Sequence, residues 1–89
     1  MMIHVTDVKP VGPFKLFIRF SDDTEGERDF AEFVQQDGVM LEPLKDAGYF
    51  AKVFLEYGAL TWPNGFDWDP IALHDEMRDM GLLRTSAAA

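Results

Sequence analysis

The chain has 89 residues, which is enough for one domain but not for two. Its 16 acidic and 8 basic residues give a net charge of −8, so the surface lacks the basic face that direct binding to DNA, RNA or an anionic membrane requires. Cysteine is absent, which excludes disulfides and thiol nucleophiles and suits a cytoplasmic location. No stretch approaches the roughly 18 apolar residues of a membrane span, and the N-terminus lacks the pattern of a secretion signal.

The first third of the chain has the alternation of apolar and polar residues that is typical of β-strands. The clearest run is residues 14–20 (FKLFIRF), in which every second side chain is apolar. Proline and glycine in residues 10–13 predict a turn before this run, and residues 21–24 (SDDT) predict a turn after it. The pattern predicts an antiparallel meander with strands over residues 3–8, 14–20 and 25–30.

Short helical turns are expected next. Asp29 is a suitable N-cap for a helical turn over residues 31–34, and Pro43 limits a second turn over residues 40–45. The aromatic and β-branched residues that follow predict a hairpin, with strands over residues 50–56 and 59–62.

The stretch TWPNGFDWDP, residues 61–70, predicts a strand, a turn and a helix start in sequence. Pro-Asn-Gly is turn chemistry, and the pair Asp69-Pro70 places an N-cap before a proline at the first helical position. Leu73, Met77 and Met80 recur at helical spacing, and Gly81 suits a C-terminal cap. We therefore predict a helix over residues 69–80.

Together these elements predict one α+β domain over residues 1–83. It contains an antiparallel three-stranded meander plus a hairpin, a short helical connection, and a C-terminal helix packed on the sheet. Residues 84–89 (RTSAAA) are expected to form a flexible C-terminal tail.

Several short motifs, in this order, resemble the domain of unknown function 2442 family of small bacterial proteins. The most specific is Trp-Pro-Asn-Gly-Phe-Asp at residues 62–67, and the resemblance covers roughly residues 2–73. Thr24 departs from the family pattern, which commonly has a glycine just after Phe-Ser-Asp. The other motifs are Val-Lys-Pro at 8–10, Phe-Ser-Asp at 20–22, Asp-Phe at 29–30, and Pro-Leu-Lys-Asp at 43–46 followed by Phe50.

The resemblance implies a compact α+β domain, with no catalytic residues that can be transferred to this chain. Some members of the family are joined to a helix-turn-helix domain, and many are encoded beside another small protein. This context implies a regulator or an antitoxin-like partner of a neighbouring small protein.

Aromatic residues are the first candidates for a binding surface, because tryptophan is enriched at interface hot spots. Trp62 fits best as a core residue at the corner before the helix. Trp68 and its neighbour Asp67 fit either the core or a recognition loop. Phe17 points away from the apolar face of its strand, so it belongs either to a second core or, together with Phe54, to an exposed patch.

Carboxylates and imidazole near the last helix raise the question of a metal site. The helical geometry argues against one, because His74 and Asp75 lie about 100° apart on a helix and Asp69 is needed as a cap. The spacing matches no known ligand motif. The acidic or imidazole side chains in question are Asp67, Asp69, His74, Asp75 and Glu76.

The sequence favours a small, non-catalytic, acidic protein-interaction module with no cofactor and no metal. No nucleophile–base–acid pattern and no phosphate-binding glycine loop is present. The expected partner is another protein with a basic surface, and Phe17, Asp67, Trp68 and Asp75 are the predicted partner-binding residues. A ligand-binding regulatory domain and a small metal-dependent enzyme are the alternatives, and a homodimer formed through an edge strand or the Phe17 face also fits.

Overall fold

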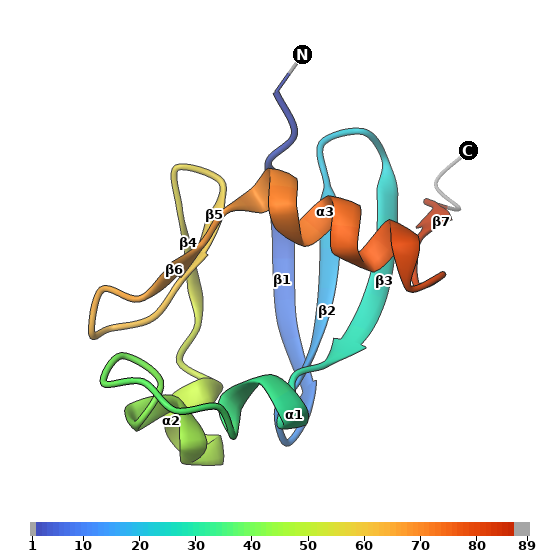
Figure 1. The fold of residues 1–89 in the computed structure, drawn as a ribbon. Helices are drawn as coiled ribbons and strands as arrows, with labels where there is room; N and C mark the ends of the chain where they lie inside the picture. The colour runs from blue at the N-terminus through green and yellow to red at the C-terminus, as the bar shows by residue number, and fades with distance from the viewer. Residues whose placement is uncertain (1, 87–89) are drawn as a thin grey trace.

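A computed structural model describes residues 2–86 and shows an α+β fold with two antiparallel sheets (Figure 1). The first sheet has the order β1 (Val5–Gly12), β2 (Lys15–Phe20), β3 (Thr24–Asp29) and β7 (Arg84–Thr85). The second has the order β4 (Phe54–Glu56), β5 (Ala59–Thr61) and β6 (Asp67–Trp68). The helices are α1 (Ala31–Val34), the 3-10 turn η1 (Pro43–Lys45), α2 (Ala47–Phe50) and α3 (Pro70–Asp79). The predicted meander, hairpin and C-terminal helix are confirmed.

The alternation in β2 builds the core. Leu16, Ile18 and Phe20 are fully buried on the face of the sheet that α3 crosses (Figure 1). Leu73 and Met77 of α3 belong to the same buried cluster. The helix therefore closes the core on this side, because its apolar side chains recur at helical spacing.

The predicted turn at residues 10–13 is wrong in its position. β1 continues to Gly12, and the turn is confined to the residues after it, where Phe14 adopts a left-handed φ of 60°. The chain tolerates Pro10 inside β1 because this strand is the outermost one of its sheet, where a missing N–H is acceptable.

The predicted strand over residues 50–56 is wrong in its first half. Phe50 ends α2 instead, and β4 includes only residues 54–56. The physical reason is an N-cap: the carboxylate of Asp46 accepts a hydrogen bond of 2.9 Å from the backbone N–H of Tyr49.

The predicted flexible tail is wrong for residues 84–86, while residues 87–89 lie outside the described part of the chain. Arg84 and Thr85 pair with β3, and the guanidinium of Arg84 lies 3.0 Å from Glu25. The hydrogen bond from Arg19 is the main reason that the pKa of the Glu25 carboxyl lies below its usual range, and a hydrogen bond from Ser86 and the positive charges of Arg19 and Arg84 lower it further. β7 fits here because Gly26, which has no side chain, leaves room for the backbone of Leu82.

The longest helix in residues 2–86 is α3, with 10 residues. None of the described helices has both the length and the apolar character that crossing a bilayer demands.

Candidate functional site

The Trp-Pro-Asn-Gly turn forms a corner at the surface whose tryptophan is buried, while Pro63 and Gly65 are exposed. Trp62 is 1% exposed, and its indole N–H donates a hydrogen bond of 2.9 Å to the carbonyl of Phe50. Gly65 turns the chain with a φ of 89°, and Asn64 donates to the carbonyl of Met40. The prediction that Trp62 fills the core is confirmed.

Trp68 leaves this corner in β6 and is only half-buried. Its ring lies 4.3 Å from that of Phe33 and 5.3 Å from that of Phe30, measured between centroids. The guanidinium carbon of Arg28 lies 5.1 Å from the centre of the Trp68 ring and 4.9 Å from that of Phe30. One edge of Trp68 thus joins the core while the rest faces a hollow in the surface.

This hollow, which we call the aromatic groove, has a volume of about 350 Å³. It lies where the end of β3, helix α1, strand β6 and the last turns of α3 meet. Met80, which is 54% exposed, forms part of its wall. Its lining residues are Arg28, Asp29, Glu32, Phe33, Gln36, Trp68, Glu76 and Met80.

The charges of the aromatic groove are unbalanced. Arg28 is satisfied internally, because its guanidinium lies 2.9 Å from a carboxylate oxygen of Glu76. Asp29 accepts a hydrogen bond of 2.8 Å from the N–H of Ala31, and neither Asp29 nor Glu32 forms an ion pair with another residue of the described chain. One guanidinium and three carboxylates give the groove a charge of −2 at neutral pH.

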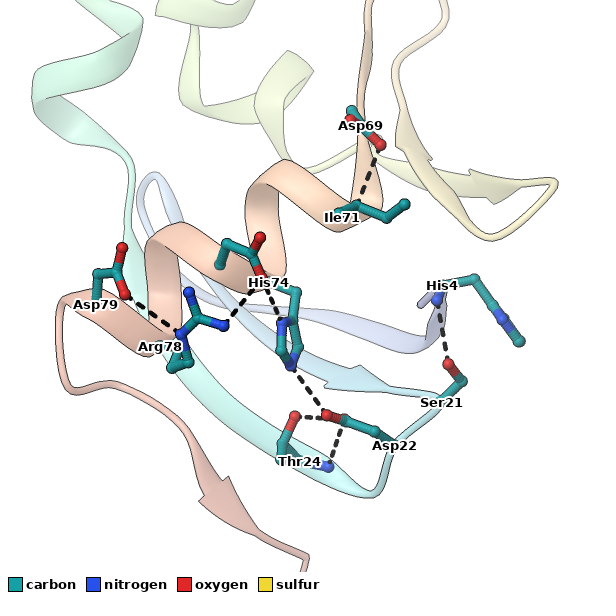
Figure 2. A network of polar contacts seen from close by, with 10 residues as sticks. His4, Ser21, Asp22, Thr24, Asp69, Ile71, His74, Arg78 and Asp79 are labelled. Atoms are coloured by element: carbon teal, nitrogen blue, oxygen red, sulfur yellow. Dashed lines mark hydrogen bonds and ion pairs between the residues drawn. The ribbon is translucent and has the colours of Figure 1, made fainter. Parts of the chain in front are cut away.

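A second polar cluster connects α3 to the turn between β2 and β3 (Figure 2). His74 is 9% exposed, and its Nε2 and Nδ1 lie 2.9 Å from Asp22 and 3.1 Å from Asp75. Asp22 also accepts hydrogen bonds from the side chain and the backbone of Thr24. Partial burial of the Asp22 carboxyl by itself would raise its pKa. The hydrogen bonds from Thr24 and His74 outweigh this effect, so the pKa of Asp22 is lowered.

We call this cluster of Asp22, Thr24, His74 and Asp75 the clamp, because it connects α3 to the turn between β2 and β3. Ser21, which precedes Asp22 in the chain, accepts a hydrogen bond of 3.1 Å from the backbone N–H of His4 and is not bonded to His74 (Figure 2). The imidazole packs edge-on against the buried ring of Phe20, with centroids 5.1 Å apart. The cluster therefore fixes α3 on the sheet.

The structure separates the residues that raised the question of a metal site. Asp69 caps α3 by accepting a hydrogen bond of 3.2 Å from the N–H of Ile71, as predicted. His74 contacts Asp75 within the clamp, while Glu76 pairs with Arg28. Within residues 2–86, no three acidic or imidazole side chains are grouped to hold a metal ion.

Of the four predicted partner-binding residues, only Trp68 lines the aromatic groove. Asp67 is its exposed neighbour in β6, and Asp75 belongs to the clamp. Phe17 lies opposite Lys9 and Glu27 on the outer face of the first sheet, where it is half-buried. Phe54, 41% exposed, lies in the other sheet.

Sequence reasoning missed most of the groove, including Arg28, Glu32, Phe33 and Met80. These residues come from two segments far apart in the chain, residues 28–33 and the end of α3, and no spacing within either segment indicates the other. The available sign was Phe33, an aromatic residue beside Glu32 in a very short helix.

Comparison with known proteins places this fold in a family. Neither the curated proteins nor the solved structures contain a match to the chain. The family model described as protein of unknown function (DUF2442) matches residues 5–79 and so includes β1 to α3, the Trp-Pro-Asn-Gly corner and the whole lining of the groove except Met80. The chain therefore belongs to the DUF2442 family.

Proposed function

We propose that the protein is a small, non-catalytic, acidic interaction module of the cytoplasm, which docks a basic protein partner in the aromatic groove. In this role it is a regulatory or antitoxin-like partner of a small neighbouring protein. The observation that carries the proposal is the half-buried ring of Trp68, which lies 4.3 Å from the ring of Phe33 in a groove that the carboxylates of Asp29 and Glu32 also line.

The chemistry of the groove suits a protein contact. A rigid aromatic ring at the centre with polar groups around it is the usual composition of an interface hot spot. The net charge of −8 attracts a basic partner over a distance set by the salt concentration, and it disfavours an approach by nucleic acid. We therefore expect binding that is fast at low salt and weak at high salt.

Co-purification tests the proposal. The tagged protein, expressed at its native level, is isolated at about 0.05 M salt and then washed at about 0.5 M, where screening is strong. We expect a stoichiometric basic protein, identified by mass spectrometry, that leaves in the wash.

Matched variants locate the contact. Glu32→Lys reverses a charge on the groove, and Glu56→Lys makes the same change on β4, outside the groove. The proposal requires that Glu32→Lys releases the partner and that Glu56→Lys retains it. Equal retention by both variants, or a preparation without a partner, would overturn docking in the groove.

A ligand-binding regulatory domain is the second candidate, because the groove volume of about 350 Å³ is within the range of small-molecule sites. A compound that occupies the groove raises the melting temperature of the protein, since it binds only the folded state. The Trp68→Leu variant should lose this shift.

A further inference from the structure

Resting on the proposed function, we infer that the partner presents an arginine, whose guanidinium enters the aromatic groove between Trp68 and the carboxylates of Asp29 and Glu32. The inference specifies the chemical group that the groove recognises, beyond the general need for a basic partner.

The chain itself shows that this wall of the groove holds a guanidinium. That of Arg28 lies about 5 Å from the ring centres of both Phe30 and Trp68 and pairs with Glu76 at 2.9 Å. Its side chain is only 12% exposed. Aromatic faces with a carboxylate at the rim thus already satisfy one guanidinium here.

The lining of the groove also has acceptors for a second cation. Asp29 uses one carboxylate oxygen to accept from Ala31, and Glu32 is exposed at the start of α1. No basic side chain of the described residues pairs with either of them. The N–H groups of an incoming guanidinium would fill these acceptors as charge-assisted hydrogen bonds.

Size and charge select arginine among the alternatives. A volume of about 350 Å³ accommodates one long side chain and the backbone beside it. Three carboxylates against one guanidinium repel phosphate and carboxylate ligands. A lysine ammonium is compact and strongly hydrated, whereas a guanidinium is planar, more weakly hydrated and stacks on rings.

Nuclear magnetic resonance titration with three small probes tests the inference. The probes are the N-acetyl methylamides of arginine, lysine and citrulline, which share a backbone and differ in the charge and shape of the side chain. We expect the arginine probe to shift the indole N–H of Trp68 and the amides of Glu32 and Phe33, and to bind about fivefold more tightly than either other probe. The indole N–H of Trp62, which is bonded to the carbonyl of Phe50, serves as the internal reference.

Two variants complete the test. Glu32→Gln should weaken binding of the arginine probe, and Glu56→Gln, with the same change outside the groove, should not. Equal affinity for the arginine and lysine probes would overturn the arginine inference while leaving a basic partner in the groove intact. Absence of shifts at Trp68 with every probe would also overturn it, and the proposed function would then be decided by co-purification.

Discussion

Asp69 shows what one side chain contributes at the start of α3. Its carboxylate accepts a hydrogen bond from the N–H of Ile71, one of the groups that the helix cannot satisfy internally. Asp69→Ala should therefore reduce the free energy of unfolding by about 1 kcal/mol, measured by urea denaturation.

The control for the cap is Asp67→Ala, two residues earlier. Asp67 is exposed and lies in β6, outside the helix. This variant should stay within about 0.5 kcal/mol of the wild type. If both variants lose the same stability, the effect of Asp69→Ala arises from charge and the cap assignment fails.

Asp22 makes the clamp sensitive to acid. Its pKa in the folded protein is lowered below the ordinary value of 3.8, so between these two pKa values the unfolded chain binds more protons than the folded one. Its stabilising contribution is present above a pH of about 4 and is lost as the pH falls through the lowered pKa. Asp22→Asn should therefore flatten the acid limb of the stability curve, which urea denaturation between pH about 2 and about 6 would reveal.

Asp23→Asn is the comparison for Asp22→Asn. It removes the same charge one residue away, at a position with a left-handed φ of 66° that asparagine tolerates. Its acid limb should keep the wild-type slope. Equal flattening in both variants would show that the general charge of the turn, and not the bonds of Asp22 to Thr24 and His74, causes the acid sensitivity.

At the scale of elements, Gly26 decides whether β7 joins the first sheet. A Cβ added at this position would overlap the carbonyl oxygen of Leu82, and the obstacle is backbone that cannot rotate away. Gly26→Ala should destabilise the protein by about 1–3 kcal/mol, the usual cost of overpacking. Thermal unfolding followed by circular dichroism would measure this loss.

Gly12→Ala is the matched control, since its Cβ would meet only Lys15 at an ordinary distance of 3.5 Å. It should unfold close to the wild-type temperature. A Gly26→Ala variant as stable as this control would mean that the segment at Leu82 moves freely and that β7 adds little.

The elements also show how far sequence alone reaches. The signals that define α3 are local, from the Asp69 cap to the left-handed Gly81, and its prediction was correct within a residue at each end. β7 was missed because two polar residues become a strand only through pairing with Thr24 and Glu25. Secondary structure that depends on a distant partner has no local pattern to detect.

The candidate site, like β7, depends on residues that are distant in the sequence. Trp68 was predicted as a partner-binding residue from its position between two acids, and the structure places it on the aromatic groove. Phe33 and Met80, which complete the apolar wall, come from α1 and from the end of α3. Only the fold, which brings residues of α1, β6 and the end of α3 around one hollow, creates a concave surface, and no segment alone encodes it.

At the scale of the whole molecule, the charge of −8 opposes the compact state. At about 0.01 M salt the screening length is about 30 Å, which exceeds the radius of gyration of 12.6 Å, so most of the acids repel one another. We expect the melting temperature to rise between about 0.01 M and about 0.3 M salt.

A charge variant checks the origin of this rise. Glu56→Lys changes the net charge from −8 to −6 and should reduce the gain that salt produces. A melting temperature that falls with salt would contradict the expectation and would show that ion pairs such as those of Glu25 with Arg19 and Arg84 dominate.

The position of β7 also has a consequence for the order of folding. Arg84 contacts Glu25 across 59 residues, whereas β1, β2 and β3 follow one another through short turns. Closing the longer loop costs more entropy, so we expect the meander to form first and β7 to dock last. Until it docks, the N–H and C=O groups along Thr24 and Glu25 are available to the same segment of another molecule. If β7 docks slowly, neighbouring molecules have time to exchange their β7 strands. The rate of β7 docking therefore limits the protein concentration at which refolding gives monomers.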